Sequence, residues 1–281
     1  MTTSPALSPT LTLNDGNTIP QLGLGVFQTP PDETAQVVRT ALEAGYRLVD
    51  TAQGYQNEEG VGEALATADV PREEVFVTTK LTNSEHGRDK ALRAFDESMR
   101  KLRLDVLDLF LIHWPLPMFD QYVETWKALE ELQRDGRVRS IGVSNFTVAH
   151  LQRLARESEV VPALNQIELH PWFPQAELRA HHAEHGIVTQ AWSPIGQGKG
   201  LLEEDAVQQV AAATGRTPAQ VVLRWHVQLG NDVIPKSVTP ERIRENLRVF
   251  DFELDEQQMA TLAGLDAGRR LGPDPETFDR R

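Results

Sequence analysis

Short runs of apolar residues recur along the chain, separated by longer stretches whose apolar residues are spaced as on one face of a helix. The apolar runs lie at residues 75–77, 107–112, 141–143, 163–167 and 187–191. Runs of this kind are typical of parallel strands that are buried on both faces. Helical spacing is clearest at Tyr122, Trp126 and Leu129, which stand at i, i+4 and i+7. The pattern therefore predicts an α/β protein in which strands and helices alternate.

The ends of the predicted strands indicate a closed (β/α)8 barrel, the TIM barrel. Eight strands are expected to end near Gly25, Asp50, Lys80, His113, Ser144, Gln166, Trp192 and Lys236. Eight strand–helix units in 281 residues match that fold, which takes about 250 residues. An open, doubly wound sheet is the alternative. It loses support because Gly23 and Gly25 are not followed by the third glycine of a G-x-G-x-x-G turn.

We expect one domain over residues 1–281, with additions to the barrel at both ends. Residues 1–9 are uncharged and lack the basic and apolar parts of a secretion signal, so we expect a flexible segment and a cytoplasmic protein. The turn residues Asn14, Asp15 and Gly16 between two short extended runs predict a β-hairpin that closes the bottom of the barrel. Thr217 followed by Pro218 predicts the start of a helix. Extra helices are expected as well, and the tail 271–281 should lie near the substrate pocket.

The amino-acid composition excludes several classes of function. The chain has no cysteine, which excludes disulfides, thiolate catalysis and cysteine-ligated metals. No stretch approaches the roughly 18 consecutive apolar residues of a membrane helix, so no membrane partner is expected. The formal net charge of −13 opposes binding to nucleic acid. An anionic cofactor would therefore need a local group of basic residues.

Four polar residues follow or end consecutive predicted strands, and together they suit the reduction of a carbonyl. In a barrel, these strand ends meet at the C-terminal rim, where active sites lie. A phenol such as Tyr55 can donate the proton, and the Lys80 ammonium would lower its pKa. Asp50 would hold Lys80 in place, and His113 could orient the carbonyl oxygen by a hydrogen bond.

Five segments resemble the signature blocks of the aldo-keto reductase superfamily. They read GYRLVDTAQGYQNEEGVGEAL, LDLFLIHWP, IGVSNF, ALNQIELHP and IPKSVTPERIRENL, in this order along most of the chain. The resemblance implies a TIM barrel that reduces aldehydes and ketones with NADPH. It implies Asp50, Tyr55, Lys80 and His113 as the catalytic tetrad, with Tyr55 as the general acid. Tryptophan at position 192 resembles the prokaryotic branch that includes 2,5-diketo-D-gluconate reductases.

The resemblance also implies a set of cofactor-binding residues. Ser144, Asn145 and Gln166 would bind the nicotinamide carboxamide, and Trp192 would stack on the nicotinamide ring. The loop with Ser193, Ile195 and Gly196 resembles one that closes over the pyrophosphate. Lys236, Ser237, Val238 and Arg242 stand where a helix begins, which suits a 2′-phosphate. Glu245 and Asn246 would contact the adenine, whereas Arg244 and Arg248 should be solvated.

A rival site is the cluster of His181, His182, Glu184 and His185. His181 and His185, at i and i+4, could bind zinc. Gly186 follows as a helix stop, so we interpret the cluster as the exposed last turn of a surface helix and expect no metal.

Two other functions stay open: a barrel that binds NADPH without turnover, like the potassium-channel β-subunit branch, and a metal-dependent hydrolase.

The substrate pocket is expected to be open. Phe27 and Trp114 keep the aromatic character that the family often places around its tyrosine. Thr82 stands where many relatives carry tryptophan, and Gly54 precedes Tyr55, so both positions remove volume. The loop 115–121 is also short. Small aldehydes, dicarbonyls or a keto sugar acid would fit such a pocket, and we expect the protein to be a monomer.

Overall fold

Eight parallel strands follow one another in chain order around a closed sheet. The computed structural model describes residues 8–280. The strands are β3 (Leu24–Gly25), β4 (Leu48–Asp50), β5 (Phe76–Leu81), β6 (Leu107–Ile112), β7 (Val138–Ser144), β8 (Leu164–Glu168), β9 (Val188–Trp192) and β10 (Asp232–Val233). Parallel bridges from Leu22 to Val233 and from Gly25 to Lys236 join the first strand to the last. The predicted TIM barrel is therefore confirmed, and the open sheet is wrong.

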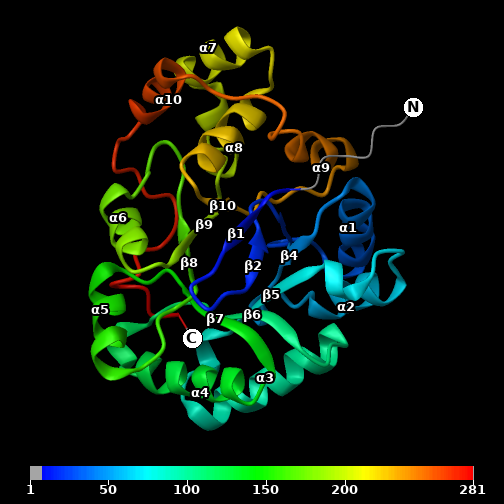
Figure 1. Ribbon diagram of the computed structural model, residues 1–281, viewed down its shortest axis with the longest axis vertical. Helices are drawn as coiled ribbons and strands as arrows, with labels where there is room; N and C mark the ends of the chain where they lie inside the picture. The colour runs from blue at the N-terminus through cyan, green and yellow to red at the C-terminus, as the bar shows by residue number, and fades with distance from the viewer. Residues whose placement is uncertain (1–7, 281) are drawn as a thin grey trace.

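Helices surround the barrel (Figure 1). Eight of them are α1 (Pro31–Ala44), α2 (Glu58–Thr67), α3 (Arg88–Leu102), α4 (Tyr122–Arg134), α5 (Val148–Glu157), α6 (Ala176–Glu184), α8 (Pro218–Gln228) and α9 (Pro240–Leu247). Two more are α7 (Asp205–Thr214), between β9 and α8, and α10 (Glu256–Ala263), after α9. The predicted start of α8 is correct, because the Thr217 hydroxyl accepts a hydrogen bond from the Gln220 amide. None of the helices in the described part of the chain is long and apolar enough to cross a membrane.

A hairpin covers the N-terminal end of the barrel, as predicted. Its strands β1 (Thr10–Thr12) and β2 (Thr18–Pro20) pair in antiparallel fashion. The Asn14 side chain donates to the Pro162 carbonyl at 3.0 Å, just before β8 begins. Of the expected flexible segment 1–9, residues 1–7 lie outside the described residues. Ser8 is described, and its hydroxyl accepts a hydrogen bond from the Leu22 amide at 3.0 Å.

Two apolar clusters form the core, and a polar layer lies above one of them. The larger cluster fills the space between helices and sheet. The smaller one lies inside the barrel, where Leu13 and Ile19 of the hairpin segment pack with Leu48, Leu109 and Leu164. Side chains near the C-terminal ends of the strands are polar, although they are buried: Asp50, Lys80, Gln166, Gln190 and Asp232. The apolar floor thus supports a polar layer at the end of the barrel that carries the site.

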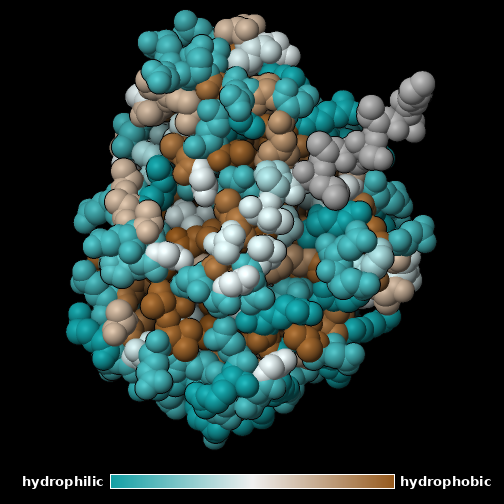
Figure 2. Space-filling model, in the orientation of Figure 1, coloured by the Kyte–Doolittle hydropathy of each residue, from teal (hydrophilic) through white to brown (hydrophobic). Residues whose placement is uncertain are grey.

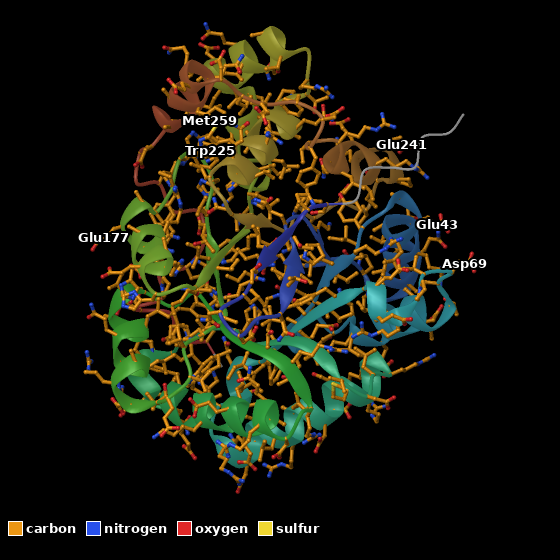
Figure 3. The ribbon with its side chains drawn as sticks, in the orientation of Figure 1. Glu43, Asp69, Glu177, Trp225, Glu241 and Met259 are labelled. Carbon is orange, nitrogen blue, oxygen red and sulfur yellow. The ribbon has the colours of Figure 1, made fainter. Side chains whose placement is uncertain are left out.

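Charged side chains lie on the outside of the molecule. Figure 2 shows one face that is largely hydrophilic, with apolar side chains visible in gaps between polar ones. In Figure 3 the exposed side chains of Glu43, Asp69, Glu177 and Glu241 lie at the periphery. This distribution fits the acidic composition, and the buried polar layer inside the barrel needs a functional explanation.

Candidate active site

The structure brings Asp50, Tyr55, Lys80 and His113 together at the C-terminal rim. The Lys80 ammonium donates to Asp50 Oδ1 at 2.6 Å and lies 3.4 Å from the Tyr55 hydroxyl. It also donates to the Thr51 carbonyl at 2.9 Å. The rings of Tyr55 and His113 meet edge to face, with their centroids 5.7 Å apart. Lys80 is fully buried, so its position is fixed by these contacts.

The turn that carries Tyr55 is held by the side chain of Gln53. Tyr55 ends a short 3-10 turn, Gln53–Tyr55, that follows β4. The Gln53 amide donates to the Ala94 carbonyl at 2.6 Å and to the Ser98 hydroxyl at 2.8 Å, both on α3. Its oxygen accepts from the Thr82 backbone amide at 2.9 Å, just beyond β5. These bonds fix the phenol relative to the strand end that supplies Lys80.

The electrostatics of the site differ from the expectation at one residue. Burial would lower the pKa of Lys80, but the Asp50 carboxylate raises it, so the amine stays charged. Burial raises the pKa of Asp50, opposed by its bonds to Lys80 and Gln166. Burial also raises the pKa of Tyr55, and the Lys80 charge only partly offsets this. Lys80 therefore lowers the pKa of Tyr55 as expected, but burial outweighs this effect and the net shift is upward.

His113 is neutral at physiological pH. Desolvation by the surrounding protein, helped by the Lys80 charge, lowers its pKa to about 3. A neutral imidazole can donate an N–H hydrogen bond to a carbonyl oxygen, but it cannot act as a strong acid there.

The residues expected around the nicotinamide also lie together. The Ser144 hydroxyl donates to the Gln166 carbonyl at 2.9 Å, and the Asn145 amide donates to the Ser144 hydroxyl at 3.1 Å. Asn145 also donates to the carbonyl of His113 at 3.0 Å. The Trp192 indole donates to Asn145 Oδ1 at 2.8 Å and remains partly exposed. One hydrogen-bonded group thus joins the ends of four strands beside the tetrad.

Sequence reasoning missed two partners of this group, Gln190 and Asp232. The Gln166 amide donates to Asp50 Oδ2 at 2.8 Å and to Gln190 Oε1 at 2.5 Å. The Gln190 amide in turn donates to Asp232 Oδ2 at 2.6 Å. Gln190 lies inside the apolar run 187–191, and this was the signal that the sequence offered. Its partner Asp232 can be identified only from the register of β9 and β10.

The residues expected at the phosphate and adenine lie along the segment that leaves β10. Lys236, Val238 and Arg242 are exposed, whereas Ser237 and Asn246 are buried. Neither Lys236 nor Arg242 forms an ion pair with any residue between 8 and 280. Glu245 accepts a hydrogen bond from the Thr217 hydroxyl at 2.7 Å.

The loop after β9 stands apart from that segment. Ser193 accepts a hydrogen bond from the Gln197 side chain at 2.9 Å, and Ile195 and Gly196 follow within the same loop. Gly196 has φ of +74°, and a Cβ there would lie 2.6 Å from Leu201. Within the described residues, no hydrogen bond or ion pair joins this loop to the segment after β10. The structure therefore brings the two segments that are expected to bind the cofactor to the rim without joining them to each other.

Among the expected pocket residues, Phe27 packs beside the phenol of Tyr55. Phe27 is 54% exposed, and its ring centroid lies 5.0 Å from that of Tyr55. A Cβ on Gly54 would lie 3.7 Å from the Thr82 hydroxyl, so these two positions are neighbours. The tail reaches the same rim, because the rings of Trp114 and Phe278 are 4.4 Å apart.

A buried carboxylate, also missed in the sequence, fastens the tail. Glu168 at the end of β8 accepts hydrogen bonds from the backbone amides of Leu271 at 2.5 Å and Gly272 at 2.8 Å. A Cβ on Gly272 would lie 2.6 Å from Trp192. The tail thus packs directly against the tryptophan expected to stack on the nicotinamide.

The histidine cluster on α6 is only partly as expected. His185 is exposed, and Gly186 follows with φ of +68°, as a helix stop requires. His182, however, is buried between Asn165 and Thr189, to which its ring nitrogens hydrogen-bond at 2.9 and 2.8 Å. The expectation that the whole cluster is solvated is wrong for His182, because it faces the barrel.

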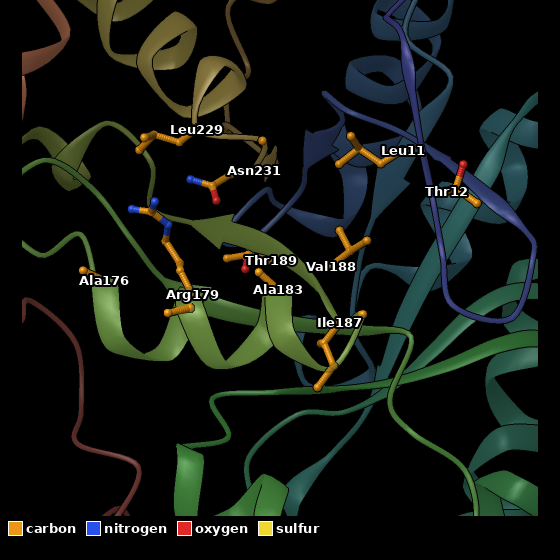
Figure 4. Close-up of a pocket in the computed structure, with 13 residues that line it drawn as sticks. Leu11, Thr12, Ala176, Arg179, Ala183, Ile187, Val188, Thr189, Leu229 and Asn231 are labelled. Atoms are coloured by element: carbon orange, nitrogen blue, oxygen red, sulfur yellow. The ribbon is translucent and has the colours of Figure 1, made fainter.

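A pocket of about 490 Å³ lies away from the tetrad (Figure 4). It is lined by Leu11 and Thr12 of the hairpin, Arg179 of α6, Thr189 of β9 and Asn231 before β10. It contains no member of the tetrad and lies beside the hairpin, at the opposite end of the barrel from the rim. We therefore assign no part of the reaction to it.

Comparison with known proteins gives one consistent result. The model of the Aldo/keto reductase family matches residues 21–267. An aldo-keto reductase of Mycolicibacterium smegmatis is 56% identical over 97% of this chain and 99% of that protein. Methylglyoxal reductase DkgA of Escherichia coli is 53% identical over 95% of this chain and 96% of its own length.

Solved structures agree with this result. The apo form of Gox0644 superposes with a TM-score of 0.93 at 54% identity, over 97% of this chain and 99% of that one. A Gox0644 mutant in complex with NADPH also gives a TM-score of 0.93, at 52% identity and the same coverage. The bacterial relatives confirm the prokaryotic branch that the sequence resembled. The chain belongs to the aldo/keto reductase family.

Proposed function

We propose that this protein reduces small aldehydes and ketones to alcohols with NADPH, and that Tyr55 donates the proton to the carbonyl oxygen. The observation that carries the proposal is the position of the Lys80 ammonium, 2.6 Å from Asp50 and 3.4 Å from the Tyr55 hydroxyl. A buried cation beside a phenol stabilises the phenolate that forms when the proton leaves. The NADPH complex of the Gox0644 mutant, at 52% identity, supports the choice of cofactor.

The residues at the rim fit a nicotinamide adenine dinucleotide phosphate. The amide oxygens of Gln166 and Asn145 and the hydroxyl oxygen of Ser144 offer acceptors to a carboxamide NH2. The partly exposed ring of Trp192 offers a face for stacking. Lys236 and Arg242, exposed and without ion pairs among residues 8–280, offer positive charge to a phosphate on an otherwise acidic protein. When it is bound, the reduced nicotinamide supplies the hydride.

The chain's own residues supply the proton and orient the substrate. Burial raises the pKa of Tyr55, so this residue is a protonated phenol at neutral pH. Lys80 stabilises the resulting phenolate, and Asp50 keeps Lys80 in place. The neutral His113 donates an N–H hydrogen bond to the same carbonyl oxygen and so aligns it with the phenol.

We propose small dicarbonyls, with methylglyoxal as the first candidate, as substrates. DkgA, 53% identical to this chain, is named a methylglyoxal reductase. Gly54 and Thr82, neighbours at the mouth, leave space beside the phenol. A keto sugar acid is the second candidate, favoured by the same open mouth. A cytoplasmic location and a monomeric state remain predictions, the latter to be tested by light scattering.

Steady-state oxidation of NADPH in the presence of methylglyoxal tests the proposal. We expect multiple turnovers, measured by the loss of absorbance of the reduced nicotinamide, and full activity in the presence of a chelator. Tight binding of NADPH without turnover over a panel of aldehydes and dicarbonyls would instead support a binding module. Loss of activity on chelation would support a metal-dependent enzyme. Either result would contradict our proposal.

A further inference from the structure

Hydrogen bonds join four buried side chains across the barrel interior, and two of them have no role in the mechanism above. Asp232 on β10 accepts from the Gln190 amide at 2.6 Å. Gln190 Oε1 accepts from the Gln166 amide at 2.5 Å, and the same amide nitrogen donates to Asp50 Oδ2 at 2.8 Å. All four residues are at most 2% exposed. Burying such a network is costly, and the cost is greatest at Asp232, whose buried Oδ1 has no hydrogen-bond partner among residues 8–280.

The carboxyl groups at the two ends decide which way each amide faces. A glutamine amide has an oxygen and a nitrogen of similar size, and only its partners distinguish them. Asp232 requires the Gln190 nitrogen, which turns the Gln190 oxygen toward Gln166. Asp50 likewise requires the Gln166 nitrogen. With both hydrogens of Gln166 Nε2 committed, its Oε1 is left as the acceptor, and no residue between 8 and 280 donates to it.

That acceptor belongs to the group expected at the nicotinamide. The Ser144 hydroxyl binds the backbone carbonyl of Gln166, and Asn145 links Ser144 to Trp192. A nicotinamide carboxamide carries an NH2 donor that matches a free amide oxygen. We propose that Asp232 and Gln190 are positioning residues that hold Gln166 with its oxygen toward the NH2 of the cofactor carboxamide. This inference rests on the proposed function.

Asp232 acts in this arrangement through Oδ2, which accepts the hydrogen bond from the Gln190 amide. Burial raises its pKa well above the ordinary value; the Gln190 bond opposes the rise, and the nearby Asp50 carboxylate adds to it. A carboxyl oxygen accepts a hydrogen bond from an amide N–H as an amide oxygen does. Asparagine therefore preserves both the shape and the acceptor at position 232, whereas leucine preserves the approximate volume and removes the acceptor.

The test compares the binding of two cofactors, measured by quenching of tryptophan fluorescence. One is NADP⁺, and the other is its 3-acetylpyridine analogue, which has a methyl group in place of the carboxamide NH2. For Asp232→Leu, we expect the Kd of NADP⁺ to rise about ten-fold and that of the analogue less than about two-fold, since only NADP⁺ loses a hydrogen bond. Asp232→Asn should bind both cofactors as the unchanged protein does.

A second variant covers the case in which Asp232→Leu does not fold. The double variant Gln190→Leu/Asp232→Leu leaves no unpaired amide at position 190, and it should show the same selective loss of NADP⁺ affinity. Equal losses for both cofactors, no loss for either, or a loss in Asp232→Asn as large as in Asp232→Leu would overturn the inference. Because binding needs no turnover, an inactive unchanged protein that still shows the selective pattern would contradict the proposed function alone.

Discussion

Preference for NADPH over NADH should depend on Arg242, and its size can be estimated from the structure. Arg242 is exposed on the first turn of α9 and has no carboxylate partner among residues 8–280. Its guanidinium is therefore available to the 2′-phosphate without breaking an ion pair. A charge-assisted hydrogen bond contributes about 1.5–3 kcal/mol, and solvent screening of an exposed group favours the lower end. One such contact corresponds to about a ten-fold change in Kd.

Arg242→Ala should thus raise the Kd of NADPH about ten-fold and leave that of NADH nearly unchanged. Titration by fluorescence at low and at high salt measures both values, and the effect should shrink at high salt. Arg244→Ala is the matched control, because it removes the same charge from the same helix at another exposed position. Equal losses for NADPH and NADH, or an equal effect of Arg244→Ala, would refute the assignment.

Three further predictions concern the pocket, the histidine and the tail. Thr82→Trp should fill the space beside Gly54 and lower kcat/KM more for branched carbonyls than for a small aldehyde; one common factor for both would contradict the open pocket. Because the pKa of His113 is about 3, titration of this residue should not change kcat/KM between about pH 5 and 8. A change of kcat/KM with pH in this range that is present in wild type and absent in His113→Gln would contradict this. Burial would raise the pKa of Glu168, but the hydrogen bonds of its carboxylate to His170 and to backbone amides lower it. The charged form of Glu168 therefore stabilises the fold at a pH above the unfolded-state pKa, and this stabilisation is lost as the pH falls through the folded-state pKa. Glu168→Gln should therefore reduce the unfolding free energy by about 1–3 kcal/mol at neutral pH, and a difference in Tm that does not shrink below about pH 4 would contradict the role of the charge.

The barrel and the grouping of the tetrad could be predicted because both follow from local pattern. Apolar runs fix the strands, and parallel strands of a barrel end at one rim. Asp50, Lys80 and His113 lie at or just beyond successive strand ends, so closing the sheet brings them together. Their identity as a reductase site came from the resemblance, because the spacing alone does not name a reaction.

Features that depend on register or on an irregular segment could not be predicted. Asp232 meets Gln190 only because these residues are paired between β9 and β10, and β10 has just two residues. The tail has no helical or strand periodicity that would place Phe278 against Trp114. The burial of His182 had a weak signal, since it shares a helix face with the buried Leu178, four residues earlier.

The net direction of the Tyr55 pKa shift could not be predicted from the sequence either. The neighbouring Lys80 was foreseeable, and its charge alone predicts a lowered pKa. The desolvation of the phenol was not foreseeable, and its effect on the pKa outweighs that of the Lys80 charge.

The central claim, that Tyr55 donates the proton, is tested most directly by Tyr55→Phe. This change removes one hydroxyl and keeps the ring that packs between Phe27 and His113. We expect kcat for methylglyoxal to fall by about 10²-fold or more, the usual contribution of a general acid, while the Kd of NADPH stays within about two-fold of wild type. A Tyr55→Phe variant that retains near-normal kcat would contradict the account.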